Sequence, residues 1–346
     1  MNILKANMLN TTFLISFCFN LQFIDIFYSI YRNKNISITG TNGKSTTAKM
    51  IYNVLKDQNF DVRLVGNIGY PILSEKKVTK NTIFVIEVSS YQLAYSKLFK
   101  SDYAIILNIS PDHLERHKTF ENYIKAKVSL INNQTSSGLA FLDKFNMRFK
   151  GKIKKNKIKS KVIHVSKKID SSILKKINNP LLRTDGNLQN ISFAFKLIDK
   201  LGLNKKKFFK TINKFKGLNF RQQIIYKKKN LTIINDSKAT SFSSTVSLLK
   251  SLKNVYWILG GIPKKGDKLL LSKNDCESLK AYIFGKNKKK FFKDLNKKLP
   301  CKMFKNLDSA IKKVFLDIKN EKNINNKTIL FSPAAASFDK FKNFED

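Results

Sequence analysis

Short runs of apolar and β-branched residues alternate along this chain with longer segments that have helical spacing. Asn35–Thr39 is one such run, and Ser45–Leu55 follows it with apolar residues at helical intervals. Further runs lie at Val62–Val65, Thr82–Val88 and Tyr103–Ile109. Because the segments between them are long enough for crossover connections, we expect a mostly parallel sheet.

A second set of apolar runs follows a predicted helix at Gln189–Leu201. These runs alternate with Lys-rich helical stretches and comprise Leu231–Ile234, Val255–Leu259, Ala281–Phe284 and Thr328–Phe331. The pattern predicts an α/β protein, with a central mostly parallel sheet domain of the P-loop type followed by a second, Rossmann-like domain. We place these domains at residues 36–216 and 217–346, after a separate N-terminal piece, residues 1–35.

One apolar stretch, Thr12–Tyr31, is long enough to be mistaken for a membrane anchor. Asn20, Gln22 and Asp25 interrupt it, and a charge near the centre of a membrane span is costly. We therefore expect no stable membrane insertion and favour a buried helix.

The composition is strongly basic, with 66 Lys and Arg against 24 Asp and Glu and a formal charge of +42 over 346 residues. Almost all of the basic residues are Lys, spread among Asn and Ile, whereas phosphate and base recognition favours Arg forks. We therefore expect no nucleic-acid partner. Cys18, Cys276 and Cys301 lie far apart, which indicates neither a disulfide framework nor a zinc site and fits a cytoplasmic protein.

The turn after the first predicted strand has the sequence of a phosphate-binding loop: Gly40, Thr41, Asn42, Gly43, Lys44, Ser45 and Thr46. Backbone N–H groups in such a turn, at a helix N-terminus, form a concave site for phosphate. Lys44 is expected to reach the β- and γ-phosphates and Ser45 the Mg²⁺. The generic pattern has glycine where this chain has Ile38, so the match is to a shorter GTNGKS/T variant.

Acidic and imidazole side chains follow the next strands. Glu87 ends the run Thr82–Val88, at the edge of the sheet where the metal of a nucleotide would lie, which makes it a candidate Mg²⁺ ligand. The next run leads into Asn108–His117, which holds two of the three histidines. The third, His164, lies in a weak strand and is interpreted as structural.

Several motifs, in order and spacing, resemble the Mur ligase family, and within it the enzymes that add D-glutamate. They are Gly40–Thr46, Gly66–Gly69, Glu87–Ser90, Asn108–His113, Ala126–Lys127, Arg221, Asn235–Thr240 and Ser332–Glu345. The resemblance covers residues 36–346. It implies an ATP- and Mg²⁺-dependent amide-bond ligase of peptidoglycan synthesis, acting through an acyl phosphate on UDP-N-acetylmuramoyl-L-alanine and D-glutamate, and we expect a monomer.

The resemblance also implies roles for individual residues. Lys44, Lys127 and His113 would be catalytic, with Lys127 carbamylated, and the metal ligands would be Ser45, Glu87, His113 and Lys127. ATP would additionally contact Asn187, Asn190, Arg221 and Asp236. The muramoyl substrate would contact Asn67 and Ser89, and the D-glutamate pocket would be formed by Lys238, Thr240, Lys264, Ser337, Phe338 and Phe344.

The chain also departs from the family pattern. The family has a whole uridine-binding domain before the phosphate loop, whereas residues 1–39 precede it here, and Lys5–Tyr31 resembles the last piece of that domain. Gly186-Asn187 stands where the family has His-Asn. Two alternatives therefore remain open, namely a catalytically impaired ATP-binding protein and a related ligase such as folylpolyglutamate synthase. The motifs near Asn235 and Ser332 argue against the second alternative.

Overall fold

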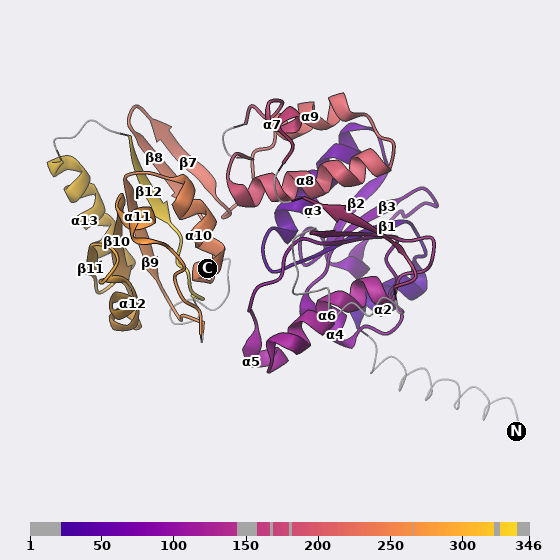
Figure 1. Cartoon of the computed structure of the whole chain (residues 1–346), viewed down its shortest axis with the longest axis horizontal. Helices are drawn as coiled ribbons and strands as arrows, with labels where there is room; N and C mark the ends of the chain where they lie inside the picture. The colour runs from indigo at the N-terminus through magenta and orange to yellow at the C-terminus, as the bar shows by residue number, and fades with distance from the viewer. Residues whose placement is uncertain are drawn as a thin grey trace, which may run out of the picture. The chain divides into compact units, whose positions relative to one another are not determined.

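A computed structural model describes residues 22–143, 158–166, 169–179, 182–264, 266–321 and 326–337. The chain divides into two compact units, Met1–Phe215 and Lys216–Asp346. Each has one six-stranded sheet with helices on both faces, which confirms the predicted α/β class (Figure 1).

The sheet of the first unit is entirely parallel, with strand order β2-β3-β1-β4-β5-β6. Its strands are β1 Asn35–Thr39, β2 Val62–Gly66, β3 Ile83–Glu87, β4 Tyr103–Ile106, β5 Leu139–Asp143 and β6 Lys161–Val165. Its helices are α2 Phe23–Ile30, α3 Lys44–Asp57, α4 Ser90–Tyr95, α5 Leu114–His117, α6 Phe120–Asn132, α7 Ser171–Leu174, α8 Asp185–Lys200 and α9 Lys205–Asn213.

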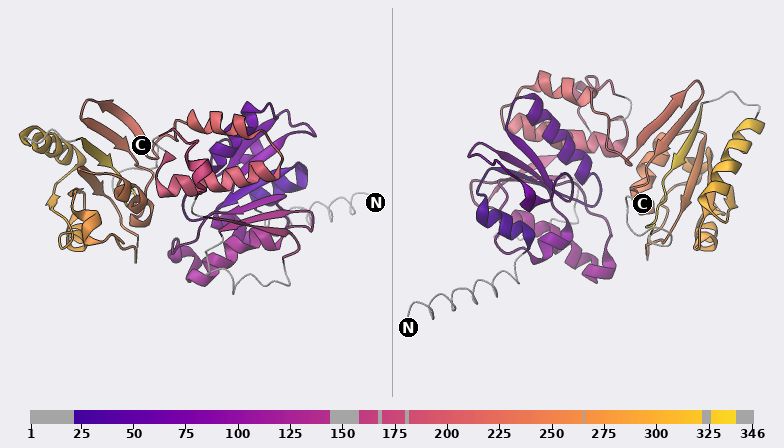
Figure 2. Two further views of the ribbon diagram at one scale, coloured as in Figure 1. Left: turned by 45° about the horizontal axis from the view of Figure 1, so that its top comes forward. Right: turned by 180° about the vertical axis from the view of Figure 1, so that it is seen from behind.

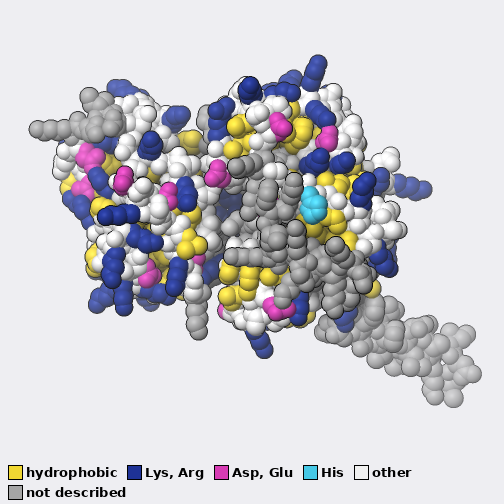
Figure 3. Space-filling model, viewed as in Figure 1, with side chains coloured by type: hydrophobic (Ala, Val, Ile, Leu, Met, Phe, Trp, Pro, Cys, Tyr) yellow, Lys and Arg dark blue, Asp and Glu magenta, His cyan; other side chains and the backbone are white. Residues whose placement is uncertain are grey.

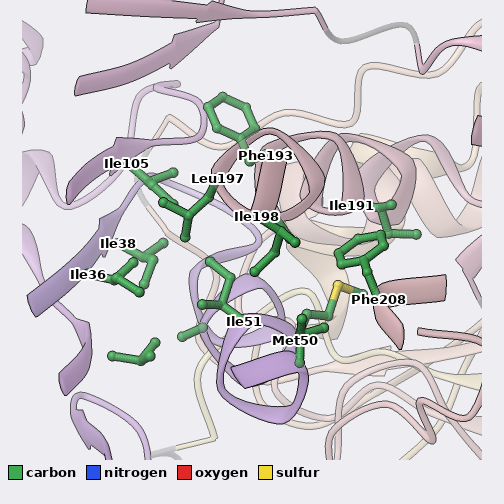
Figure 4. Packing of buried hydrophobic residues seen from close by; sticks show 14 of the residues in the cluster. Ile36, Ile38, Met50, Ile51, Ile105, Ile191, Phe193, Leu197, Ile198 and Phe208 are labelled. Carbon is green, nitrogen blue, oxygen red and sulfur yellow. The ribbon is translucent and has the colours of Figure 1, made fainter. Parts of the chain in front are cut away.

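Two hydrophobic clusters cover the two faces of this sheet. Helices α3, α8 and α9 pack on one face, where Ile38 and Ile105 from the sheet meet Ile51 and Leu197 (Figures 1 and 4). Helices α2, α4 and α6 lie on the opposite face, as the two further views also show (Figure 2). The loop after β1 therefore leads to one face and the loop after β4 to the other, which makes the β1–β4 pair a topological switch point.

The second unit has strand order β11-β10-β9-β12-β8-β7, in which only the edge pair β7–β8 is antiparallel. The strands are β7 Gln223–Lys228, β8 Leu231–Asn235, β9 Val255–Gly260, β10 Leu279–Phe284, β11 Cys301–Met303 and β12 Lys327–Phe331. The helices are α10 Phe242–Ser251, α11 Lys273–Cys276, α12 Lys288–Leu295 and α13 Leu307–Asn320. Helices α10 and α12 cover one face of the sheet and α13 the other.

Two predicted elements have different bounds in the structure. The run Tyr103–Ile109 leaves the sheet after Ile106, because Asn108 turns its carbonyl oxygen to the backbone N–H of Thr41, 2.9 Å away. The helix predicted at Gln189–Leu201 begins earlier, at Asp185, because the Thr184 hydroxyl caps it by accepting from the N–H of Asn187.

The apolar stretch Thr12–Tyr31 is described only from Gln22 onward. There it forms the eight-residue helix α2, which buries Ile24, Asp25 and Phe27, as expected for a buried helix. In the described part of the chain, no helix is both long and apolar enough to cross a membrane. Lys and Arg side chains are scattered across the face shown in Figure 3, which fits a basic composition spread over the surface.

Candidate active site

The loop between β1 and α3 is shaped by Gly43, which caps α3 with φ +85° and ψ −7°. This left-handed conformation favours glycine. A Cβ atom at this position would lie 2.2 Å from Oδ1 of Asn190, a buried residue of α8. Two independent features therefore require glycine at position 43, namely the left-handed backbone conformation and the close approach of Asn190.

Asn108, which follows β4, holds the loop in place. Its Oδ1 accepts from the N–H of Asn42 at 2.8 Å, and its Nδ2 donates to the carbonyl oxygen of the same residue at 3.0 Å. Gln189 on α8 contacts the Asn108 amide at 3.3 Å. Asn108 was expected only as the first residue of the motif Asn108–His113, and Gln189 only as the start of a predicted helix, so neither had an individual predicted role.

Two lysines converge on one oxygen atom of the loop. Lys44 Nζ donates to the carbonyl oxygens of Gly40 at 3.0 Å and Thr41 at 2.8 Å. Lys127 Nζ, from α6, donates to the same Gly40 oxygen at 2.8 Å and lies 3.4 Å from Thr39 Oγ1. Residues predicted from separate motifs thus meet at the end of β1.

Lys127 is a buried lysine, with 1% of its surface exposed. Burial, and then the positive charge of Lys44, lower the pKa of its amino group well below the ordinary value. Both effects shift the equilibrium of this group towards the neutral amine. Its Nζ lies 4.6 Å from the ring centre of Tyr123, whose hydroxyl is 3.1 Å from Thr41 Oγ1.

Glu87 ends β3, beside β1, and its carboxylate is 1% exposed. Its Oε1 accepts from Asn67 Nδ2 at 3.0 Å, whereas Oε2 is buried and has no hydrogen-bond partner. Burying a carboxylate oxygen without a hydrogen-bond donor or a cation beside it costs free energy, so the position of Oε2 suits a metal ion. Ser89, two residues later, caps α4 through its hydroxyl, which accepts from the N–H of Gln92.

The two histidines after β4 have different surroundings. His113 has φ +54°, and its Nδ1 lies 2.8 Å from the hydroxyl of Tyr91. His117 is buried, and its Nε2 lies 3.0 Å from Ser90 Oγ. Burial lowers the pKa of His117, which favours its neutral form. In the described residues, His, Cys, Asp and Glu side chains nowhere form a cluster of three suited to a metal.

The remaining predicted residues of the first unit occupy the start of two helices. Ser45 is buried at the second position of α3, and Thr46 follows it. Asn187 lies in the first turn of α8, and its Oδ1 is 3.5 Å from Asn190 Nδ2.

In the second unit, Asp236 directly follows β8 and is buried. Its Oδ1 accepts from the N–H of Gln222 at 3.1 Å and its Oδ2 accepts from Ser332 Oγ at 2.9 Å. Burial raises the pKa of this carboxyl to about 6, although these two hydrogen bonds and the charge of Arg221 oppose the rise.

The candidate D-glutamate residues follow three strands, β8, β9 and β12, that lie side by side and parallel. Lys238 is exposed and Thr240 half-buried after β8. Ile262 and Ala336 exchange backbone hydrogen bonds of 2.7 and 3.1 Å, which brings the segments of Lys264 and Ser337 together. Phe338 and Phe344 lie outside the described residues.

The first unit thus has the architecture of a nucleotide-binding α/β protein, with a phosphate loop at the switch point of a parallel sheet. Residues 38–198 match the model of the Mur ligase middle domain. The UDP-N-acetylmuramoylalanine--D-glutamate ligase of Rickettsia felis is 34% identical over 341 residues, which cover 93% of this chain and 75% of that protein. The protein of the same name from Francisella tularensis is 34% identical over 329 residues, covering 93% and 76%.

Among solved structures, MurF ligase from Thermotoga maritima in complex with ADP has a similar fold, with a TM-score of 0.69 and 16% sequence identity. The match covers 90% of this chain and 78% of that one. This chain belongs to the Mur ligase family, whose members are ATP-dependent peptide ligases. The resemblance found in the sequence motifs is therefore confirmed.

Proposed function

We propose that this chain joins D-glutamate to the alanyl carboxyl group of UDP-N-acetylmuramoyl-L-alanine, with ATP and Mg²⁺. The observation that carries the proposal is the convergence of Lys44 and Lys127 on the Gly40 carbonyl oxygen, at 3.0 and 2.8 Å. This convergence places the lysine of the phosphate loop and the buried lysine of α6 in the same site. The name of the Rickettsia felis relative, 34% identical to this chain, supports the choice of substrates.

The reaction has two steps. The alanyl carboxylate attacks the γ-phosphorus of ATP, which forms an acyl phosphate and releases ADP. The amine of D-glutamate then attacks the acyl carbon, phosphate leaves with the C–O bond electrons, and the nitrogen loses a proton. Both steps accumulate negative charge, so groups fixed around the phosphates stabilise the transition state.

Lys44 and the loop N–H groups would bind the phosphates of ATP. Lys44 would exchange its hydrogen bonds to the Gly40 and Thr41 carbonyl oxygens for phosphate oxygens. Asn187 and Asn190 would contact ATP from α8, and Arg221 and Asp236 are the candidates in the second unit. Asn67 and Ser89 would contact the muramoyl substrate.

Mg²⁺ would be held by Ser45 and Glu87, and a second ion by His113 and a carbamylated Lys127. The partnerless Oε2 of Glu87 supports the first assignment. Bound Mg²⁺ would offset negative charge on the phosphate oxygens. Carbamylation needs a neutral amine that attacks CO₂ and then loses a proton, and the lowered pKa of Lys127 supplies that amine.

D-Glutamate would bind in the second unit, where Lys264 would pair with a carboxylate. Lys238, Thr240 and Ser337 are the other described candidates, and Phe338 and Phe344 complete the proposed set.

The test is release of phosphate from ATP by the full chain in the presence of UDP-N-acetylmuramoyl-L-alanine and Mg²⁺, with and without D-glutamate. We expect sustained release only when both substrates are present, and a product whose mass equals that of the joined substrates. Replacement of D-glutamate by L-glutamate provides the control. ATP binding without any substrate-dependent release would contradict the proposal and favour the catalytically impaired alternative.

A further inference from the structure

Three aromatic rings form a continuous row between His113 and Lys127. The Tyr91 ring lies 5.0 Å from that of His113 and stacks on His117 at 5.6 Å, with an angle of 10° between the planes. His117 contacts Tyr123 edge-on at 5.3 Å, and Lys127 lies over Tyr123. The row links the two residues proposed to hold the second metal ion.

The Tyr91 hydroxyl is within hydrogen-bond distance of one nitrogen of the His113 ring. It lies 2.8 Å from Nδ1, where Glu115 Oε1 is also within 3.4 Å. The other nitrogen, Nε2, lies 3.5 Å from Asp112 Oδ2. A carboxylate oxygen lies within 3.5 Å of each ring nitrogen, so the 2.8 Å contact with Tyr91 is the feature that distinguishes Nδ1 from Nε2. When the phenol oxygen accepts this hydrogen bond, the proton is on Nδ1 and the Nε2 lone pair can bind a cation.

We infer that Tyr91 is a positioning residue, whose phenol oxygen accepts the Nδ1–H of His113 and so presents Nε2 of His113 to a divalent cation. The inference rests on the proposed role of His113 as a metal ligand. Metal-bound histidines commonly donate their second ring N–H to an oxygen, and loss of that partner weakens metal binding. The carboxylate of Asp112, beside Nε2, suits a cation at the same place.

The surroundings hold Tyr91 in the position that this role requires. Its helix, α4, begins with a capping box formed by Ser89 and Gln92, so the backbone before Tyr91 is fixed. On one side of its ring lies His117, which is itself held by Ser90. The phenol therefore reaches His113 without further rearrangement, and its hydroxyl is the only group that a Tyr91→Phe substitution removes.

The first test reads the tautomer directly, without metal or substrate. Long-range ¹H–¹⁵N NMR spectra of the full chain are recorded near pH 8, where an ordinary imidazole, with a pKa of about 6.5, is neutral. The chain has three histidines, and a His113→Gln variant identifies the signals of His113. We expect the Nδ1–H form in the wild type and a shift towards the Nε2–H form in Tyr91→Phe.

The matched control is Tyr95→Phe on the same helix, because the Tyr95 hydroxyl accepts from Arg116 instead, at 3.0 Å. We expect this variant to retain the wild-type tautomer. An unchanged His113 spectrum in Tyr91→Phe would overturn the inference.

The second test measures Mn²⁺ affinity, by electron paramagnetic resonance of the free ion, as a substitute for Mg²⁺. We expect Tyr91→Phe to weaken binding to the second Mn²⁺ site about 10- to 100-fold and Tyr95→Phe to leave it unchanged. If His113→Gln weakens Mn²⁺ binding but Tyr91→Phe does not, the inference fails while the proposed metal role of His113 stands. If His113→Gln has no effect, that metal role fails and the inference fails with it.

Discussion

Lys127 Nζ donates a hydrogen bond of 2.8 Å to the carbonyl oxygen of Gly40, which also accepts from Lys44 Nζ at 3.0 Å. Two protonated amines on one oxygen would repel each other, and burial disfavours the charged form of Lys127 in particular. The contact thus places beside the phosphate-loop lysine a second lysine whose lowered pKa favours the neutral amine that reacts with CO₂.

Replacing Lys127 by Met should abolish ligation while making the fold more stable at pH 7. The folded-state pKa lies below the unfolded value of 10.5, so the unfolded chain binds more protons between these two values. The stability of the wild type therefore rises with pH across that window. At pH 7 the wild type is destabilised by the burial of an ionisable amino group, and replacement by Met removes this destabilisation. Urea unfolding at pH 7 and pH 10 measures the difference, which should shrink at the higher pH.

The matched control is Lys125→Met on the same helix, since Lys125 is exposed and lies only 3.8 Å from Glu121 in a surface ion pair. It should change unfolding by less than about 0.5 kcal/mol. A Lys127→Met protein that is less stable than the wild type at pH 7 would contradict the lowered pKa of Lys127.

Gly43→Ala should destabilise the protein and remove ATP binding. The left-handed backbone costs about 1–2 kcal/mol for alanine, and the clash with Asn190 Oδ1 adds a comparable amount. Gly202→Ala is the control, because Gly202 has φ +67° but no atom within 4 Å of the added Cβ. Asn190→Ala in the Gly43→Ala background should recover part of the loss, and urea unfolding of all four proteins would detect it.

Asn108→Asp should weaken ATP binding more than Asn108→Ala. Aspartate cannot donate to the carbonyl oxygen of Asn42, and it places a negative charge beside the proposed phosphate site. Alanine removes both hydrogen bonds without adding charge. Calorimetric titration with a non-hydrolysable ATP analogue provides the comparison. Equal affinities of the two variants would show that a negative charge at position 108 does not affect nucleotide binding.

Asp236→Asn should stabilise the second unit above pH 6 and have little effect near pH 4. The pKa rises from 3.8 in the unfolded chain to about 6 in the folded one, so the folded state binds more protons between these values and stability falls as pH rises. A rise of the pKa from 3.8 to about 6 corresponds to a loss of ~3 kcal/mol in the free energy of unfolding above pH 6. The urea unfolding midpoints of the wild type and the variant are compared at pH 4 and pH 8. A larger stabilisation by Asn at pH 4 than at pH 8 would refute the predicted pH dependence.

Asp25→Ala should strongly destabilise the protein. In the sequence, Asp25 is marked only as a charged residue that interrupts an apolar run. Its fully buried carboxylate accepts from Ser96 Oγ and from the N–H groups of Lys97, Leu98 and Phe99, at 2.7–3.0 Å. Loss of the acceptor leaves four donors unmatched, at a cost of roughly 3 kcal/mol or more. Ser96→Ala, which removes one donor, should cost about 1 kcal/mol in the same urea assay.

The sequence by itself determined the local elements and their order. The strand at Asn35–Thr39, the glycine loop and the helix after it occur as predicted, because periodicity, glycine and helix capping act over a few residues. It also determined the family, since the motifs lie at fixed spacing along the chain. The antiparallel strand β7 was not predicted, because its apolar pattern is short and lies at the edge of the sheet.

Only the tertiary structure decided which of the marked residues meet. Lys127 contacts Gly40 across 87 positions, Asn108 holds Asn42 across 66, and Asp25 binds the Ser96–Phe99 turn across more than 70. Such contacts depend on the order of strands in the sheet and on the face that each helix covers, and no local pattern encodes either. The same packing buries Lys127 and thereby lowers the pKa of its amino group, an effect that no local pattern around Lys127 encodes.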